Sequence, residues 1–149
     1  MKIVVQRVSR ASVRVKGEIV GSIGRGLLLL VGVETGDGPE QVARAAHRLA
    51  TLRVFEDEHG HMNRGLDEVG GEILVVSQFT LYADCRHGRR PSFTDAAQPE
   101  LARLLIEEFV RMLQAEGVQH VANGAFGAHM LVEIHNDGPV TIMLDSDDL

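Results

Sequence analysis

The chain has 149 residues, 44% of them apolar, and a formal net charge of −6. This length is typical of one domain with a sizeable core, so we predict a single domain over residues 1–149. The one cysteine, Cys85, excludes an intrachain disulfide framework and favours the reducing cytoplasm. The longest apolar run, residues 27–33, is too short to cross a bilayer, and residues 1–2 lead directly into strand pattern without the apolar region of a signal peptide. We therefore expect a cytoplasmic protein that does not associate with membranes.

Basic residues are concentrated in two places. The first 25 residues contain six basic residues and one acid, and Arg86, Arg89 and Arg90 form a second group. An acidic protein does not attract nucleic acid through its overall field, but local patches of this kind can bind a few phosphates. A solvated strand face and an arginine-rich loop give the same pattern, and charge alone favours that simpler interpretation.

The first quarter of the chain has the pattern of β-structure. Residues 2–8, 12–16, 19–23 and 27–33 each predict a strand, with glycine-containing turns at residues 17–18 and 24–26. Four strands before any helix indicate an antiparallel or mixed sheet rather than a βαβ repeat.

Two helices are predicted in the rest of the chain. The first begins at Pro39 and has apolar residues at helical spacing from residue 42 to 52. The second begins around Pro99 and ends at Gly117. Residues 54–55, 118–121, 130–134 and 140–144 predict further short strands. The predicted fold class is α+β: a mixed or antiparallel, barrel-like strand-rich body with two main helices packed on it.

The central strand ends in an unusual way. Residues 73–76 form a short β-branched apolar run, typical of a strand buried on both faces. Ser77, Gln78 and Thr80 follow it directly, with Phe79 among them. Burying such polar groups without partners costs about 1–3 kcal/mol each, so they either line a pocket or turn the chain through local hydrogen bonds to the backbone. The residues themselves leave both interpretations open.

Familiar catalytic patterns are missing from the sequence. The seven histidines and Cys85 do not have the spacing of a zinc site, and we expect no metal. No nucleophile elbow, P-loop or dinucleotide fingerprint is present, so we expect no cofactor. Thr80 would need an adjacent base to act as a nucleophile, and the sequence nominates none.

A second unusual stretch, residues 136–141, lies between two predicted strands. It reads Asn-Asp-Gly-Pro-Val-Thr, and a hairpin turn is its default interpretation. About 5–6% of X-Pro bonds in folded proteins are cis, so the sequence leaves the isomer of Gly138-Pro139 open. A cis bond would present the two carbonyls side by side, in an arrangement suited to an ammonium group.

Together, residues 77–83 and 136–141 resemble the paired signatures of the D-aminoacyl-tRNA deacylase family. Four flanking segments, residues 6–8, 60–63, 90–93 and 126–130, occur in the expected order, so the resemblance covers nearly the whole chain. The chain departs from the family pattern at Gly65, where a small hydroxyl residue is expected, and at Ala125, where a basic residue is frequent.

The resemblance implies a homodimer with its active site at the subunit interface. Such an enzyme hydrolyses the ester that joins a D-amino acid, or glycine mischarged on tRNA-Ala, to the 3′ end of a tRNA, and it rejects L-aminoacyl-tRNA. A cis Gly138-Pro139 bond reaching into the partner subunit's pocket would hold the substrate's α-amino group. The implied site residues are Ser77, Gln78, Phe79 and Thr80 for catalysis and Gly138, Pro139, Asn136 and Met130 for substrate binding. The basic patches make Arg7, Arg86, Arg89 and Arg90 candidates for contacts with tRNA phosphates.

The chemistry that we expect is attack of water on the ester carbonyl. Backbone N–H groups near Phe79 and Thr80 would stabilise the oxyanion, Gln78 would position the ester, and the substrate's ribose 2′-hydroxyl would assist. Two alternatives from other classes are a non-catalytic tRNA- or ligand-binding module and a small-molecule esterase with Thr80 as nucleophile. Aromatic residues make up only 4% of the chain, too few for extended base stacking.

Overall fold

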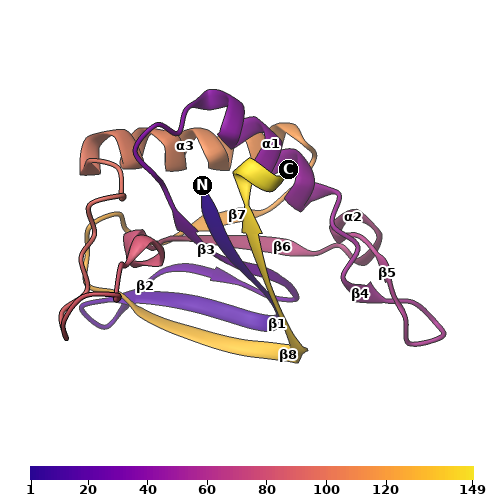
Figure 1. Ribbon diagram of the computed structural model, residues 1–149. Coiled ribbons are helices and arrows are strands. Elements are labelled where there is room, and N and C mark those ends of the chain that lie inside the picture. The colour runs from indigo at the N-terminus through magenta and orange to yellow at the C-terminus, as the bar shows by residue number, and fades with distance from the viewer.

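The computed structural model describes residues 1–149 and consists of a curved sheet with helices on one side (Figure 1). The elements, in chain order, are β1 (Lys2–Val15), β2 (Glu18–Ile23), β3 (Gly26–Gly32), α1 (Pro39–Ala50), β4 (Phe55–Glu56), β5 (Met62–Arg64), α2 (Leu66–Val69), β6 (Glu72–Ser77), the 3-10 turn η1 (Phe79–Tyr82), α3 (Pro99–Ala115), β7 (Val121–Asn123), β8 (Leu131–Asp145) and the 3-10 turn η2 (Ser146–Asp148).

The main sheet has six strands, in the order β2-β1-β3-β6-β7, with β8 paired along the other edge of β1. Strand β1 is antiparallel to β2, β3 and β8, whereas β6 is parallel to both β3 and β7. The sheet curls until β2 contacts β7, and α1 and α3 pack against each other over its outer face (Figure 1). The predicted α+β class, with a mixed, barrel-like body and two main helices, is confirmed.

Strand β6 lies between two apolar clusters and contributes side chains to both. Ile73 and Val75 belong to the larger cluster between the sheet and the helices, which includes Phe109 of α3, and Leu74 and Val76 belong to a smaller cluster inside the curl. All four β6 side chains are at most 1% exposed. The prediction of a strand buried on both faces is therefore confirmed, and β6 is a rigid support for the residues that follow it.

Two strand predictions at the start of the chain were wrong. Residues 2–8 and 12–16 are not separate strands, because β1 runs without a break from Lys2 to Val15, so three strands and not four precede α1. The polar pair Ser9 and Arg10 looks like a turn in the sequence. In the structure β1 pairs with β3 before this pair and with β2 after it, while β8 pairs along both halves, and this pairing keeps the strand extended.

Three further predictions need correction. Residues 130–134 and 140–144 are not two strands joined by a hairpin turn, because β8 continues through residues 136–139. Strand β7 begins at Val121, three residues later than predicted. A short helix, α2, and the β4–β5 hairpin lie between α1 and β6, where only a short strand at residues 54–55 was predicted.

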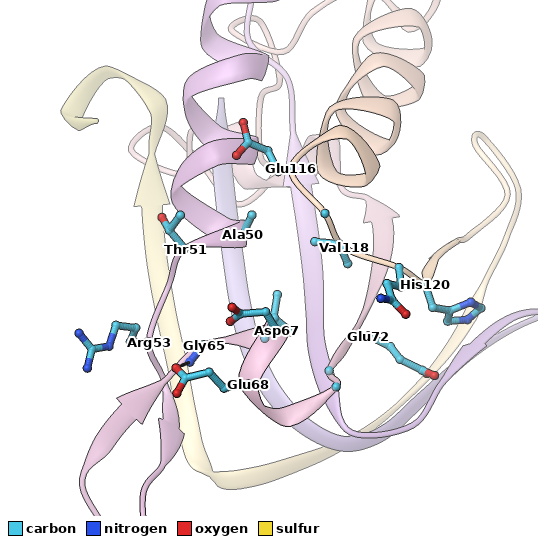
Figure 2. Close-up of a pocket in the computed structure, with 15 residues that line it drawn as sticks. Ala50, Thr51, Arg53, Gly65, Asp67, Glu68, Glu72, Glu116, Val118 and His120 are labelled. Atoms are coloured by element: carbon cyan, nitrogen blue, oxygen red, sulfur yellow. Dashed lines mark hydrogen bonds between the residues drawn. The ribbon is translucent and has the colours of Figure 1, made fainter.

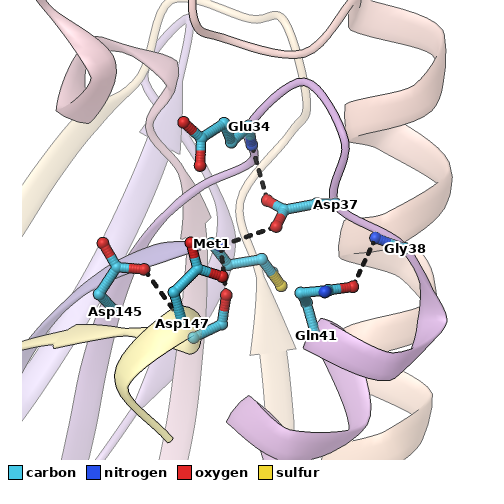
Figure 3. Close-up of polar contacts among 8 residues, drawn as sticks. Met1, Glu34, Asp37, Gly38, Gln41, Asp145 and Asp147 are labelled. Atoms are coloured by element: carbon cyan, nitrogen blue, oxygen red, sulfur yellow. Dashed lines mark hydrogen bonds and ion pairs between the residues drawn. The ribbon is translucent and has the colours of Figure 1, made fainter.

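The two ends of the chain meet beside α1 (Figure 3). The amino group of Met1 is buried and donates to Asp37 Oδ1 at 2.9 Å and to Ser146 Oγ at 2.5 Å. Asp37 also accepts from the backbone N–H of Glu34 at 2.7 Å. These contacts fix the start of β1 and the end of β8 against the loop that leads into α1. None of the helices is long and apolar enough to span a membrane.

Candidate active site

The polar strand end is held by backbone hydrogen bonds to β3. Ser77 is the last residue of β6, and the N–H of Gln78 donates to Val31 O at 2.8 Å. The chain then turns into η1, where the N–H of Leu81 donates to Gln78 O. The N–H groups that open a helical turn have no partner inside it, so those of Phe79 and Thr80 are free to bind a ligand oxygen.

The side chains at this strand end contact each other and not a base. Gln78 Nε2 donates to Thr80 Oγ1 at 2.5 Å, and the threonine hydroxyl has no histidine, carboxylate or lysine partner. Phe79 is 56% exposed and packs edge-on against Phe93, with ring centroids 5.0 Å apart. A threonine without a base is a poor nucleophile, so the geometry favours an orienting role for Thr80.

Tyr82 anchors the other end of η1. Its ring is buried, and Lys2 Nζ lies 4.7 Å from the ring centroid, within the range of a cation–π contact. Burial raises the pKa of the Tyr82 phenol, so the hydroxyl stays neutral at all physiological pH values. The turn that carries the free N–H groups is therefore fixed at both ends.

A cavity of about 170 Å³ opens beside Ser77. Its walls come from β6, α3 and the loop after β7, and they include Asn123, Phe126, Arg103 and Glu107. The cavity combines apolar and polar walls and reaches Ser77, the last residue of β6. A second cavity, of about 490 Å³, lies against η1, and its lining includes Leu81, Tyr82 and Arg86.

The largest cavity, about 640 Å³, lies at the opposite end of β6 (Figure 2). Its carboxylates serve the fold: Glu68 accepts from the N–H of Gly65 at 3.0 Å, Glu72 accepts from the N–H of Gly24 at 2.7 Å, and Glu116 contacts His47 Nδ1 at 3.0 Å. A cavity lined by carboxylates repels a phosphodiester. We therefore place the candidate site at the other end of β6, despite the smaller volume there.

Residues 137–140, which belong to the second unusual stretch of the sequence, form a bulge in β8. Gln6 of β1 pairs with Thr141 and Val8 pairs with Asn136, so one residue of β1, Arg7, lies opposite four residues of β8. The surplus residues must leave the plane of the sheet. Gly138 and Pro139 are both exposed, and the peptide bond between them is cis.

Arg7 holds this bulge from inside the protein. It is only 4% exposed; its Nε donates to Asp137 O at 2.9 Å and its Nη1 donates to Val54 O at 2.7 Å. Its guanidinium also lies 3.6 Å from Glu56 Oε1 and 3.7 Å from Asp137 Oδ2. Arg7 is among the candidates for contacts with tRNA phosphates, but in the structure its guanidinium makes these internal contacts.

Asn136 closes the bulge from the other side. Its Nδ2 donates to Arg7 O at 3.3 Å and to Val140 O at 3.1 Å, so its amide connects the two ends of the bulge to β1. Gly138 leaves no room for a side chain, since a Cβ there would lie 2.9 Å from Arg7 Nη2 and 2.8 Å from Val140 Cγ2. Its φ of +139° also favours glycine.

Within one chain, the bulge and the polar strand end are far apart. Arg7 pairs with Leu27 of β3, and Leu27 pairs with Ile73 at the start of β6. Ser77, the end of β6, lies four residues beyond Ile73, which corresponds to roughly 13 Å along the strand, and η1 follows it. In Figure 1 the corner of β8 lies at the bottom of the molecule, and the short coil that follows β6 lies apart from it at the left. The structure does not bring Gly138 and Pro139 to Ser77–Thr80 within a single chain.

Met130 lies close to the polar strand end. A Cβ on Gly124 would be only 2.7 Å from Met130 Sδ, and the N–H of Gly124 donates to Val75 O at 2.9 Å. Of the four residues expected to bind substrate, Met130 is therefore near Ser77 in the same chain, and the other three belong to the bulge.

The three arginines of the loop after η1 differ in their contacts. Arg86 donates Nε and Nη2 to the carboxylate of Asp84 at 2.9 and 2.7 Å. Hydrogen bonding to Arg86 lowers the pKa of Asp84 to about 2. Arg89 and Arg90 are exposed and form no hydrogen bond or ion pair. No group of three or more His, Cys, Asp or Glu side chains is placed to hold a metal ion.

The structure has N–H donors without a partner at the end of β6 and exposed carbonyl acceptors on the bulge of β8, and Thr80 has no neighbouring base. Comparison with known proteins identifies the family. The family model described as D-Tyr-tRNA(Tyr) deacylase matches residues 4–145. The chain belongs to this family, as the resemblance predicted.

Relatives and solved structures extend the match over the whole chain. A D-aminoacyl-tRNA deacylase of Thermomicrobium roseum is 59% identical over 100% of this chain and 96% of its own length, and one of Heliobacterium modesticaldum is 57% identical over 97% and 96%. The structure of a c-Myc DNA unwinding element binding protein is 42% identical, with a TM-score of 0.91 over 97% of this chain and 98% of that one. A probable eukaryotic D-amino acid tRNA deacylase, 19% identical with a TM-score of 0.81 over 96% and 97%, shares the fold.

Sequence reasoning missed the positions of two residues. Arg7 follows Ile3 and Val5 on the buried face of β1, so strand alternation was a usable signal that its side chain points inward. The contact of Phe93 with Phe79 joins residues 14 apart, and no local pattern predicts it.

Proposed function

We propose that this chain hydrolyses the ester bond between a D-amino acid, or glycine, and the terminal adenosine of a tRNA, and that it rejects L-aminoacyl-tRNA. Family membership and the names of the relatives support the reaction class. The observation that carries the chiral part is the bulge of β8, which presents the main chain of Gly138 and Pro139 to the outside and is fixed by Arg7 and Asn136.

In this proposal the enzyme is a homodimer, and each active site contains groups from both subunits. Within its own chain the bulge, opposite Arg7 of β1, is separated from β6 by two strands and lies roughly 13 Å along the strands from the end of β6, so in this proposal a second copy supplies it. Strand β8 is a long edge strand with an unpaired outer edge, and it exposes Leu131 (62%) and Met143 (71%). Exposed edges with apolar side chains favour association, which supports β8 as part of the dimer interface.

The partner's bulge would recognise the substrate's ammonium group. The carbonyl oxygens of Gly138 and Pro139 would accept hydrogen bonds from the α-amino group, which orients the substituents of the α-carbon. An L side chain would then point into the same backbone, whereas a D side chain or the hydrogen of glycine would point away. Recognition through the main chain fits an enzyme that must accept many different side chains.

The end of β6 would carry out the hydrolysis. Water attacks the ester carbonyl, and the N–H groups of Phe79 and Thr80 stabilise the oxyanion, a contribution of about 10²–10³ in rate for a single donor. Gln78 positions the ester and Thr80 orients Gln78 through their mutual hydrogen bond. The substrate's 2′-hydroxyl assists. The tRNA substrate and the single free cysteine fit a cytoplasmic location.

A deacylation assay with D-, L- and glycyl-tRNA tests the proposal. Rapid release of D-amino acids and glycine, with L-aminoacyl-tRNA left intact, is the expected result. A gel shift without release would indicate a non-catalytic binding module. Cleavage of simple esters that contain no tRNA, together with an acyl-enzyme on Thr80 detected by mass spectrometry, would indicate an esterase of another kind.

A further inference from the structure

The loop of residues 84–92 is anchored at both ends. The N–H of Asp84 donates to Ser92 O at 2.7 Å, and the N–H of Ser92 donates to Asp84 O at 2.9 Å. Phe93, the next residue, packs against Phe79 at the end of β6. The loop therefore has a fixed position relative to the free N–H groups of η1, although its own residues 85–90 are exposed.

The three arginines of the loop differ in their contacts. Arg86 is neutralised by its double hydrogen bond to Asp84 at the base of the loop, where it stabilises the loop's conformation. Arg89 and Arg90 are consecutive, exposed arginines without any partner in the chain. Two unpaired cations on one short loop create a local positive potential, although the chain as a whole is acidic. The phosphates of a nucleic acid strand would provide the matching negative charge.

We infer that Arg89 and Arg90 bind the phosphates of the single-stranded 3′ end of the tRNA, on the 5′ side of the terminal adenosine, and that Arg86 positions the loop; this inference rests on the proposed function. Arg90 lies three residues before Phe93, so their Cα atoms are at most about 11 Å apart. With the terminal ester at η1, the phosphates within reach are those of the last few nucleotides. Guanidinium groups bind phosphate oxygens in bidentate fashion, which suits this contact.

A local cation pair also resolves the conflict between a net charge of −6 and a polyanionic substrate. The overall field of the protein repels RNA, so binding must depend on a few close contacts next to the site. Each single-strand phosphate contact contributes about 0.7 to the slope of log K against log salt concentration. Two such contacts make binding about sevenfold weaker between 50 and 200 mM salt.

The experiment compares two substrates with the Arg89→Gln/Arg90→Gln double variant. One substrate is D-aminoacyl-tRNA, and the other is 2′(3′)-O-D-aminoacyl-adenosine, which carries the same ester but no phosphates. Relative to the unmodified enzyme, KM for the tRNA substrate should rise by about fivefold to tenfold at 100 mM salt. The slope of log K against log salt concentration should become smaller by about 1.4. The ratio of the two KM values should shift by the same factor, with kcat retained. Arg48→Gln, which removes an exposed and unpaired arginine of α1, is the matched control.

Each outcome has a distinct meaning. An unchanged KM and salt slope for the double variant, in an enzyme that does deacylate D-aminoacyl-tRNA, would refute the phosphate contact and leave the proposed function intact. An equal loss on both substrates would also refute it, since the loop would then act on the ester site. No hydrolysis of either substrate by the unmodified protein would refute the proposed function itself. Arg86→Gln should raise KM for tRNA less than the double variant does and should increase amide exchange at Ser92.

Discussion

The end of β6 and the bulge of β8 both present main-chain polar groups, but they present opposite ones. At the end of β6 the free groups are N–H donors, on a turn fixed by apolar packing around β6 and by Tyr82. At the bulge the free groups are carbonyl acceptors, fixed by the buried charge of Arg7 and the amide of Asn136. An aminoacyl ester needs both, donors for its developing oxyanion and acceptors for its ammonium. In the proposed function these are two complementary halves of one site, and the geometry of the sheet separates them within a single chain.

The largest effect should come from removing a single donor at the end of β6. Thr80→Pro removes the backbone N–H at a position where a helical turn tolerates proline, whereas Thr80→Ala removes only the hydroxyl. We expect a fall in kcat of about 10²–10³ for Thr80→Pro. We expect a loss of only about tenfold or less for Thr80→Ala, the cost of one hydrogen bond. Single-turnover deacylation measures both, and circular dichroism checks the fold. The reverse order of effects would make the hydroxyl, and not the main chain, the catalytic group.

A side chain at Gly138 should disturb the bulge by a comparable amount. The Cβ of Gly138→Ala would overlap Arg7 and Val140 and displace the neighbouring carbonyls, and a displacement of about 1 Å at a binding group costs about 10²-fold in rate. Gly17→Ala is the matched control, because Gly17 has a φ of +83° and no atom would lie within 4 Å of the added methyl group. Both variants should lose about 1–2 kcal/mol of folding free energy from backbone strain. Only Gly138→Ala should lose kcat/KM, and an equal loss in both would contradict the role of the bulge.

A more moderate effect is expected from Arg7→Lys, which keeps the charge but loses the fork of donors. At least one of the carbonyls of Asp137 and Val54 would lose its partner, at a cost of about 1–3 kcal/mol in the free energy of unfolding. Because the bulge would become mobile, discrimination between D- and L-aminoacyl-tRNA should fall by about tenfold. The ratio of the two kcat/KM values measures this positioning role. A destabilised variant with unchanged discrimination would leave Arg7 with a purely structural role.

The smallest effect concerns the pH dependence of the contact between Asp84 and Arg86, where the arginine loop begins. The pKa of Asp84 is about 2 in the folded chain, below its ordinary value, because Arg86 stabilises the carboxylate. A lowered pKa means that the contact is fully formed above the ordinary value and is lost only as the pH falls through about 2. An NMR titration of the Asp84 carboxyl carbon should therefore have its midpoint near pH 2, and the midpoint should rise in Arg86→Gln. A midpoint at the ordinary value in the unmodified protein would show that the pair does not form.

The structural elements that depend on local sequence patterns could be predicted from the sequence. Strand β6, the helices that begin at Pro39 and Pro99, and the polar strand end all follow from apolar periodicity and from the chemistry of proline and glycine. The bulge was interpreted as a turn because residues 136–139 have turn chemistry. It is a bulge because β1 pairs with β8 on both sides of it, and no local pattern records a partner strand more than 120 residues away.

Arg7 shows how charge and strand geometry can point to different roles. Its charge suggested a phosphate contact, although its place in the alternation after Ile3 and Val5 put it on the buried face. The charge was interpreted without the strand geometry that decides where it points. The distance between Gly138 and the end of β6 is a property of the sheet register, and it became evident only when the strands were paired.

The most direct test of a site built from two copies is complementation between inactive subunits. Thr80→Pro and Gly138→Ala proteins are each expected to be nearly inactive as homodimers, but a mixed dimer contains one site with an intact strand end from one subunit and an intact bulge from the other. After unfolding and refolding an equal mixture, the account predicts recovery of about a quarter of the unmodified activity on D-aminoacyl-tRNA, as expected for random pairing in a two-fold symmetric dimer. A mixture that stays as inactive as its components would contradict the account, because each site would then be formed within a single chain.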